Sequence, residues 1–414
     1  MSGRRTNATA RDALRSLNQN AVLQIVHLEG PISRVEIAAR LHLSPAAVTS
    51  ITAELIDRGL IYEARQAASD GVGRKAILLE VNYDQAFVAG IKVSNVALTL
   101  ALTNLNAEVQ CAQSTALDRT DPDTVIDEIV AAFEHLQEER LIGALGVNLP
   151  GIVDCDQGTV RHSPLLGWNQ VALGEILEAR LGVPVLVEND VNALALAEAW
   201  YGHGREHDSF FVLTLGRGVG LGIVINGELY RGPNGGAGEI GHVLLDPDGP
   251  ETGHARKGTL EAYISDEALV REAKARIPGF AGATLSERSP VDQLVELARQ
   301  GQEQAVSIYA KAGKTLGRAM STLVNILAPS LIVLSGEGMR AADFLLPSAE
   351  AELKRLSFGD LGERVSLVVD PWGDDAWARG AAGLAASRYL TNAAMSVGGD
   401  QQPDQGPKLD VTNI

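Results

Sequence analysis

Val187-Glu188-Asn189-Asp190 and Gly238-Glu239-Ile240-Gly241-His242 are two polar clusters that enclose the part of the chain on which its fold depends. Between them lies Leu215-Gly216-Arg217-Gly218-Val219-Gly220-Leu221-Gly222-Ile223, an apolar, hairpin-like run in which every second residue is glycine. Strand-forming residues precede Glu188 and helix-forming residues follow Asp190, so this cluster stands at the end of a strand, where α/β folds bind ligands. Polar groups beside glycines suit a polyhydroxylated small molecule better than an apolar one.

The composition is that of a soluble, globular protein with room for several domains. The 414 residues are 45% hydrophobic and 21% charged, enough for two or three domains with sizeable cores. Apolar runs are shorter than a membrane span and no signal segment follows Met1, so we expect a cytoplasmic protein without membrane contact. Cys111 and Cys155 are the only cysteines, too few for a disulfide framework and not in metal-ligand spacing.

The charge is unevenly distributed along the chain. The net charge is −17, but residues 1–80 hold ten basic and eight acidic side chains, which leaves +2 there and −19 in the remainder. Because the Debye length is about 8 Å at physiological salt, a distant acidic body does not cancel a local basic face. Charge alone leaves two interpretations open, a nucleic-acid-binding face and an ordinary solvated surface.

Residues 20–82 have the pattern of three short helices followed by a two-stranded wing. Helical spacing of apolar residues continues until Gly30-Pro31, and residues 1–17 precede it as a loose arm or the start of that helix. Ser33-Arg34-Val35-Glu36 is a capping box, and Ser44-Pro45 places a cap and a first-turn proline before the next helix. This order predicts a winged helix-turn-helix, although similar three-helix units also serve as protein-docking modules.

The last of these helices presents small or hydroxylated side chains outward, so its backbone can lie close in a major groove. The wing has a basic tip that would reach phosphate or the minor groove. The residues expected to contact DNA are therefore Ser44, Thr49, Ser50, Arg65, Arg74 and Lys75.

Three consecutive strands, a helix and a fourth strand follow a linker at residues 82–85. The strands are expected over residues 86–93, 96–104 and 108–117, with a helix near 122–139 and the next strand at 142–148. This β-β-β-α-β order is typical of the ribonuclease-H-like lobe of the actin and hexokinase superfamily. The fold class is accordingly α/β, with an N-terminal winged helix-turn-helix followed by a two-lobed actin/hexokinase-like domain.

The glycine-rich run, followed by Gly232 and Gly241-His242, resembles the signature of the ROK family, which holds bacterial sugar kinases and sugar-responsive repressors. The likeness extends from about Ala86 to Leu390, and residues 20–82 resemble the winged helix-turn-helix of ROK-type repressors. The resemblance implies that Asp190 matches the base that activates the sugar hydroxyl in the kinases. It also implies sugar contacts from Asn189, Glu239, His242 and Glu261, with Trp168 and Asn169 bordering the sugar.

The chain departs from the kinases at the first phosphate loop. ROK kinases carry Asp-x-Gly-Gly-Thr-Lys there, whereas this chain has Lys92-Val93-Ser94-Asn95-Val96-Ala97. The missing aspartate removes a metal anchor, and side chains replace the glycines that admit ATP phosphates. We therefore expect neither ATP binding nor kinase activity. Arg217, where the second phosphate loop usually has a small hydroxyl residue, fits this view but is also compatible with a surface arginine.

The chain also lacks the zinc loop of most ROK proteins. Three cysteines are missing at the positions of Thr252, His254 and Thr259, which leaves His242 and His254 as the only matching ligand types. Because structural zinc needs about four nitrogen or sulfur ligands, we expect no zinc and no other cofactor. The loop must then be held by other packing or be more mobile.

Several of these residues have an ordinary structural explanation as well. A tryptophan in a turn, such as Trp168, is often a packing anchor, and Asp190 could cap the helix that it begins while also facing a ligand. His242 could be simply packed or exposed. The segment Ser335-Gly336-Glu337-Gly338 resembles the family's adenine-side motif, which without the first phosphate loop is inherited architecture rather than a nucleotide site.

We expect residues 1–82 to form the DNA-binding domain, 83–200 one lobe completed by a helix near 375–390, 201–374 the second lobe, and 391–414 a disordered tail. The leading hypothesis is a sugar-responsive transcriptional regulator that binds operator DNA and a monosaccharide or sugar-derived effector as a homodimer or homotetramer. The alternatives are an ATP-dependent ROK sugar kinase with an appended DNA-binding module and a sugar-binding scaffold that docks protein.

Overall fold

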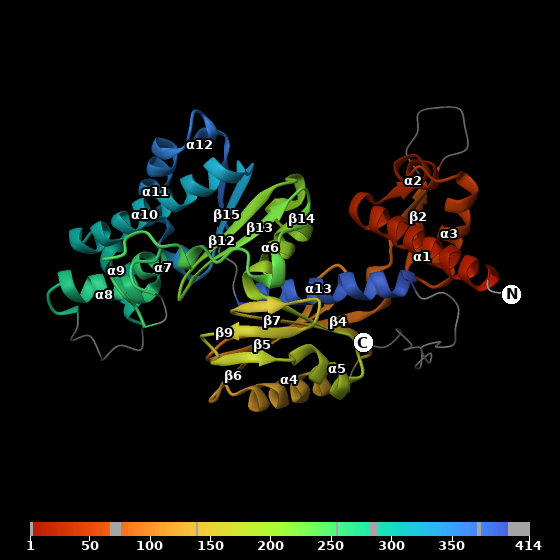
Figure 1. Cartoon of the computed structure of the whole chain (residues 1–414), viewed down its shortest axis with the longest axis horizontal. Helices are drawn as coiled ribbons and strands as arrows, with labels where there is room; N and C mark the ends of the chain where they lie inside the picture. The colour runs from red at the N-terminus through yellow and green to blue at the C-terminus, as the bar shows by residue number, and fades with distance from the viewer. Residues whose placement is uncertain are drawn as a thin grey trace, which may run out of the picture. The chain divides into compact units, whose positions relative to one another are not determined.

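The computed structural model describes residues 3–66, 76–137, 140–253, 256–280, 289–370 and 374–395 (Figure 1). The chain divides into two compact units, one formed by Met1–Ala86 with Ser387–Ile414 and the other by Phe87–Ala386. Within the described residues, none of the helices has the length and apolar character needed to span a membrane.

The first unit is a winged helix-turn-helix. Its three helices pack on a three-stranded antiparallel sheet of order β1-β3-β2. The sheet has one strand more than the expected two-stranded wing, because the residues just before the capping box pair with β3. The elements are α1 (Gly3–Glu29), β1 (Ile32–Ser33), α2 (Arg34–Leu41), α3 (Pro45–Asp57), β2 (Ile61–Gln66), β3 (Ile77–Val81) and η1 (Tyr83–Gln85).

Side-chain caps begin both α2 and α3. The Ser33 hydroxyl accepts from the Glu36 backbone N–H at 3.3 Å, and the Glu36 carboxylate accepts from the Ser33 N–H at 2.9 Å. The Ser33 hydroxyl also donates to the Glu36 carboxylate at 2.7 Å, and this bond, together with that from the Ser33 N–H, lowers the pKa of Glu36. Ser44 caps α3 by accepting from the Ala47 N–H at 3.2 Å. Both predicted caps are confirmed, and of the two alternatives for residues 1–17 the structure shows the start of the first helix, because α1 begins at Gly3.

The second unit begins with a five-stranded sheet of order β11-β7-β4-β5-β6, which confirms the expected β-β-β-α-β arrangement. The parallel strands β4, β7 and β11 lie side by side, so their carboxyl ends share one edge. A small sheet, β8-β9-β10, was not expected. The elements are β4 (Phe87–Val93), β5 (Ala97–Asn104), β6 (Val109–Ala116), α4 (Pro122–Gln137), β7 (Ile142–Leu149), β8 (Ile152–Asp154), β9 (Thr159–Ser163), β10 (Trp168–Val171), α5 (Leu173–Leu181), β11 (Val185–Asn189) and α6 (Asp190–Tyr201).

A second five-stranded sheet, of order β14-β13-β12-β15-β16, completes the unit. The predicted hairpin is β12 paired with β13. The helix α11 was not expected. The elements are η2 (His203–Glu206), β12 (Phe210–Leu215), β13 (Val219–Ile225), β14 (Glu228–Leu229), η3 (Pro233–Gly235), η4 (Ile240–His242), α7 (Glu261–Ile264), α8 (Asp266–Arg276), α9 (Pro290–Arg299), α10 (Glu303–Leu327), β15 (Leu331–Ser335), η6 (Glu337–Ala341), α11 (Ala342–Leu356), α12 (Leu361–Arg364), β16 (Ser366–Val369) and α13 (Asp374–Met395).

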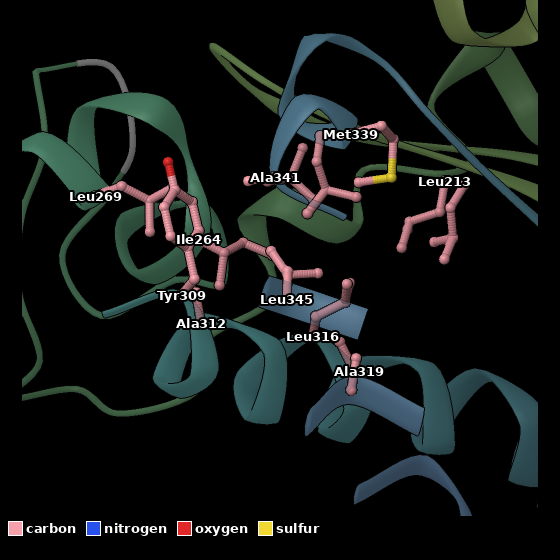
Figure 2. Close-up of a cluster of buried hydrophobic side chains, with 14 of the residues drawn as sticks. Leu213, Ile264, Leu269, Tyr309, Ala312, Leu316, Ala319, Met339, Ala341 and Leu345 are labelled. Carbon is pink, nitrogen blue, oxygen red and sulfur yellow. The ribbon is translucent and has the colours of Figure 1, made fainter. Parts of the chain in front are cut away.

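Long helices bury the core of the second sheet. Figure 2 shows Tyr309, Ala312 and Leu316 of α10 facing Leu345 of α11, with Leu213 of β12 close by. All five are buried, so α10 and α11 cover one face of this sheet with a continuous apolar layer.

The helix α13 lies against the first sheet because glycines leave room for it. A side chain at Gly146 of β7 would place its Cβ 2.6 Å from the Ala381 carbonyl carbon, and one at Gly90 of β4 would lie 2.8 Å from the Ala382 Cβ. The helix also continues to Met395, so the expected tail does not begin at residue 391. Residues 396–414 lie outside the described part of the chain.

Gly146→Ala tests this close packing. We expect the variant to lose about 1–3 kcal/mol of unfolding free energy, since the added methyl must displace the α13 backbone. Urea unfolding followed by circular dichroism measures the change. Gly236→Ala is the control, because a Cβ there meets open space. An unchanged midpoint for Gly146→Ala would show that α13 is not packed this tightly.

Candidate functional site

The Glu-Asn-Asp segment forms the junction between β11 and α6. Asn189, not Asp190, is the helix cap: its side-chain oxygen accepts from the Asn192 N–H at 3.0 Å. The Asn189 amide also donates to the Gly151 carbonyl at 2.9 Å. The expectation that Asp190 caps the helix was therefore wrong, because α6 already begins at Asp190, which makes the preceding residue, Asn189, the cap. The Asp190 carboxylate accepts a local bond from the Val191 N–H at 2.9 Å.

Burial dominates the electrostatics of Asp190. It raises the pKa of this carboxyl above its ordinary value, and the nearby Glu337 carboxylate acts in the same direction. The Lys92 ammonium and the Val191 N–H oppose this shift. A carboxylate with a raised pKa at the carboxyl edge of a parallel sheet is typical of a functional site.

Glu188 is a structural anchor beneath this junction. Its side chain is 2% exposed, and its Oε2 accepts from Arg231 Nε at 2.6 Å. The other oxygen, Oε1, accepts from the Asn189 N–H at 2.9 Å and from the Asn192 amide at 3.1 Å. Because Arg231 follows β14 of the second sheet, this ion pair joins the two sheets of the unit. No pattern in the sequence indicates that Arg231 is the partner of Glu188.

Glu239, His242 and Glu261 come together at η4 and the start of α7. His242 Nε2 lies 3.7 Å from Glu239 Oε2, and the Glu261 carboxylate accepts from the Val219 N–H at 2.9 Å. Burial raises the pKa of Glu239, His242 lowers it, and Asp190 and Glu261 raise it further. The electrostatic influence of Asp190 on Glu239 indicates that the predicted sugar-contacting carboxylates from both sheets converge on one site.

The hairpin β9–β10 contributes one expected residue and one that the sequence analysis missed. The Asn169 side-chain oxygen lies 2.7 Å from His162 Nδ1 on the paired strand. Both side chains are exposed, and His162 also lowers the pKa of Glu239. A lone histidine within a short strand carries no sequence signal of this role, which follows only from the pairing of β9 with β10.

Trp168 is a packing anchor. Its side chain is 1% exposed within the core of the first sheet, and its indole N–H donates to the Thr120 carbonyl at 2.6 Å. The structure therefore contradicts a direct contact between this ring and a ligand. The large apolar ring finds its place in the core, and only its neighbour Asn169 is exposed.

The two loops that hold phosphates in ROK kinases are joined here by side chains. Arg217 Nη1, in the turn between β12 and β13, donates to Asn95 Oδ1 at 2.6 Å. The Ser94 hydroxyl bonds within its own turn, donating to the Ala97 carbonyl at 2.9 Å. Lys92 is 8% exposed, with its ammonium 4.5 Å from the centroid of the Trp377 ring. A cation at the position of a metal-anchoring aspartate does not fit a magnesium-nucleotide complex.

Residues 243–253 and 256–259 are held by hydrogen bonds to one another and to α8. Leu244 bridges Thr259 in antiparallel fashion, and the Thr259 hydroxyl donates to the Arg256 carbonyl at 2.8 Å. The Gly253 N–H donates to the Glu267 carboxylate at 2.9 Å. Across the described ranges there is no group of three or more histidine, cysteine, aspartate or glutamate residues that could hold a metal. The residues present do not fit a zinc site, and His254 lies outside the described residues.

The candidate DNA-binding face is the exposed side of α3. Thr49 and Ser50 are exposed, with the Thr49 hydroxyl donating to the Pro45 carbonyl at 2.8 Å and the Ser50 hydroxyl to Glu54 at 3.4 Å. Ser44 is also exposed, at the cap of the helix. Arg65 belongs to β2, but its side chain is not described, and Arg74 and Lys75 lie outside the described residues.

Comparison with known proteins follows the same division of the chain. The ROK family model matches residues 88–388, and the MarR family model matches residues 16–67. The DNA-binding transcriptional dual regulator NagC of Escherichia coli K12 is 31% identical over 350 residues, which is 82% of this chain and 85% of NagC. The xylose repressor of Bacillus subtilis is 26% identical and covers 92% of this chain and 98% of its own length.

Comparison with solved structures leads to the same family. A ROK family transcriptional regulator, a homologue of the Escherichia coli Mlc protein, superposes with a TM-score of 0.81 at 28% identity and covers 92% of this chain and 98% of its own. A ROK glucokinase from Streptomyces griseus, in complex with glucose and AMPPNP, has a TM-score of 0.64 at 29% identity and covers 72% of this chain and 99% of its own. The chain therefore belongs to the ROK family and has the winged-helix organisation of the family's transcriptional regulators.

Proposed function

We propose that this chain is a sugar-responsive transcriptional repressor of carbohydrate genes. The observation that carries the proposal is the convergence of Asp190, Glu239 and Glu261 in a chain that also has a winged helix-turn-helix. Its relatives include the N-acetylglucosamine repressor of Escherichia coli O157:H7 and the xylose repressor of Bacillus subtilis. Carboxylates, an amide and an imidazole are the acceptors and donors that suit the hydroxyls of a monosaccharide.

We propose that sugar binding at this site changes the conformation of the protein and, through it, the affinity for DNA. Asn189 and Asp190 come from the edge of the first sheet, whereas Glu239, His242 and Glu261 belong to the second-sheet half of the unit. A sugar that contacts both groups favours the conformation in which the groups are closest. A differential affinity of about 1.4 kcal/mol between two conformations changes their ratio tenfold, which a few hydrogen bonds to carboxylates can supply.

We propose operator DNA as the macromolecular partner and a homodimer or homotetramer as the assembly. A helix-turn-helix contacts about one half-site, so two copies are needed to read a palindromic operator. The exposed, small side chains of α3 support contact with a major groove.

The proposed function includes no catalysis and no cofactor. Phosphoryl transfer depends on clamping a metal and positioning phosphates. Lys92, Asn95 and Arg217, at the positions that resemble the kinase phosphate loops, instead bond to or pack on other side chains of the protein. In a coupled assay with ATP, magnesium and D-glucose, D-xylose or N-acetyl-D-glucosamine, we expect no sugar-dependent release of ADP. Turnover that Asp190→Asn abolishes would establish the kinase alternative.

Thr49→Glu should separate DNA binding from sugar binding. A negative charge on the exposed face of α3 repels phosphates, so we expect affinity for operator DNA to fall at least about tenfold while sugar binding is retained. Fluorescence anisotropy measures this, using a duplex selected by the wild-type protein from a random library. Thr322→Glu is the matched control, because Thr322 is also exposed and makes the same bond to the carbonyl four residues earlier. Equal affinities for both variants would exclude α3 from the interface.

Glu239→Ala should abolish the response to sugar and leave DNA binding intact. It removes an acceptor from the sugar site but lies outside the winged helix, so we expect the effect of sugar on DNA binding to disappear while DNA affinity without sugar is unchanged. The same anisotropy assay, with and without each sugar, measures both quantities. Glu228→Ala, an exposed glutamate in β14, serves as the control. Parallel loss of sugar response and DNA affinity would assign Glu239 a purely structural role.

A further inference from the structure

Lys92 holds a buried cation at the carboxyl edge of the first sheet. In the sheet it is paired with Asn148 of β7, which is paired in turn with Glu188 of β11. Residues in one such row point to the same face of a sheet. The row ends two residues before Asp190, and the Asn148 amide donates to the Trp377 carbonyl at 2.6 Å. The Lys92 ammonium lies over the Trp377 ring, so its position is fixed by α13.

Charged groups of both signs act on Asp190. Besides burial, which raises its pKa, Lys92 of β4 lowers the pKa and Glu337 of η6 raises it, and Asp190 in turn raises the pKa of Glu239 beside η4. Glu239 in turn has His242, His162 and Glu261 around it. Each buried carboxylate costs free energy unless a cation balances it. Glu188 has its own partner in Arg231, and the positive charge that acts on Asp190 is that of Lys92.

Resting on the proposed sugar site, we propose that Lys92 is a positioning residue whose ammonium replaces a divalent cation as the fixed counter-charge of Asp190. An ammonium supplies the positive charge that keeps Asp190 an acceptor for a sugar hydroxyl. It has no open coordination position for phosphate, and it repels a metal ion. Sugar affinity should therefore be independent of magnesium.

Lys92→Met removes the charge and keeps an apolar side chain of similar length against Trp377, whereas Lys92→Arg keeps the charge. Titration calorimetry of the full chain with D-glucose, D-xylose and N-acetyl-D-glucosamine, from pH 8 to pH 5, measures the effect. For a sugar that the wild type binds, we expect Lys92→Met to lose at least about tenfold in affinity at pH 7. Lys92→Arg should retain most of it, and Lys311→Met, at an exposed lysine paired with Glu272, should be unchanged.

The pH profile distinguishes the charge from packing. Burial already raises the pKa of Asp190, and loss of the opposing ammonium raises it further. Because the ionised carboxylate is the better acceptor, affinity falls as the pH drops through that pKa. The fall should begin at a higher pH in Lys92→Met than in the wild type. An affinity and pH profile equal to those of the wild type would overturn the role of Lys92, whereas failure of the wild type to bind any sugar would instead count against the proposed function.

Unfolding supplies a second readout that needs no ligand. In the Asp190→Asn variant the Lys92 ammonium stays buried without its counter-charge. Lys92→Met should therefore lower the free energy of unfolding less in the Asp190→Asn variant than in the wild type. A double-mutant cycle from urea unfolding measures this coupling, and a cooperative unfolding transition confirms that each variant is folded before urea is added. Additive losses would mean that Lys92 acts through packing alone, which contradicts the proposal.

Discussion

The burial of carboxylates where β11 meets α6 is the constraint on which the rest of the site depends. A buried charge is tolerated only with a partner, and Glu188 finds one in Arg231, at 2.6 Å. Because Arg231 belongs to the segment after β14, the ion pair holds the second sheet's hairpin against the end of the first sheet. The backbone and amide bonds from Glu188 to Asn189 and Asn192 then fix the first turn of α6. Asp190 is thereby presented at the sheet edge with its orientation set by its neighbours.

The glycines of the hairpin have two separate uses. Gly220 and Gly222 face α6, where a Cβ would lie 2.5 Å from Val191 and 2.6 Å from Ala195, so they allow the helix to pack directly on β13. A Cβ added at Gly218 would instead lie 3.0 Å from the Glu261 carboxylate. The sequence pattern was interpreted as room for a ligand, but half of the alternation serves helix packing. A period of two puts these glycines on one face of the hairpin, and the sequence does not say which element covers each part of that face.

Features set by neighbouring residues were predictable, and those set by distant ones were not. The caps at Ser33 and Ser44, the strands β4 to β7 and the hairpin of β12 with β13 follow from local patterns. The helix α11 was not predicted. Pro347 lies within it, and a proline in the sequence argues against a helix, but packing on α10 overrides this local preference. The cap at Asn189 and the bond from Arg217 to Asn95 depend on where a strand ends and on a residue far along the chain. The positions of the sugar-site residues came from family resemblance, whereas their contacts came from the fold.

A sugar site beside an altered phosphate loop has a thermodynamic consequence. In an enzyme, binding energy is useful when it lowers the free energy of the transition state relative to the bound substrate. In a regulator, the useful quantity is the difference in affinity between two conformations of the protein. A site that binds sugar without converting it keeps its ligand for as long as the sugar concentration persists, so occupancy follows concentration at equilibrium. The proposed role of Lys92 meets this requirement with a single residue, because a lysine at the position of the metal-anchoring aspartate supplies no metal ligand and still lowers the pKa of Asp190.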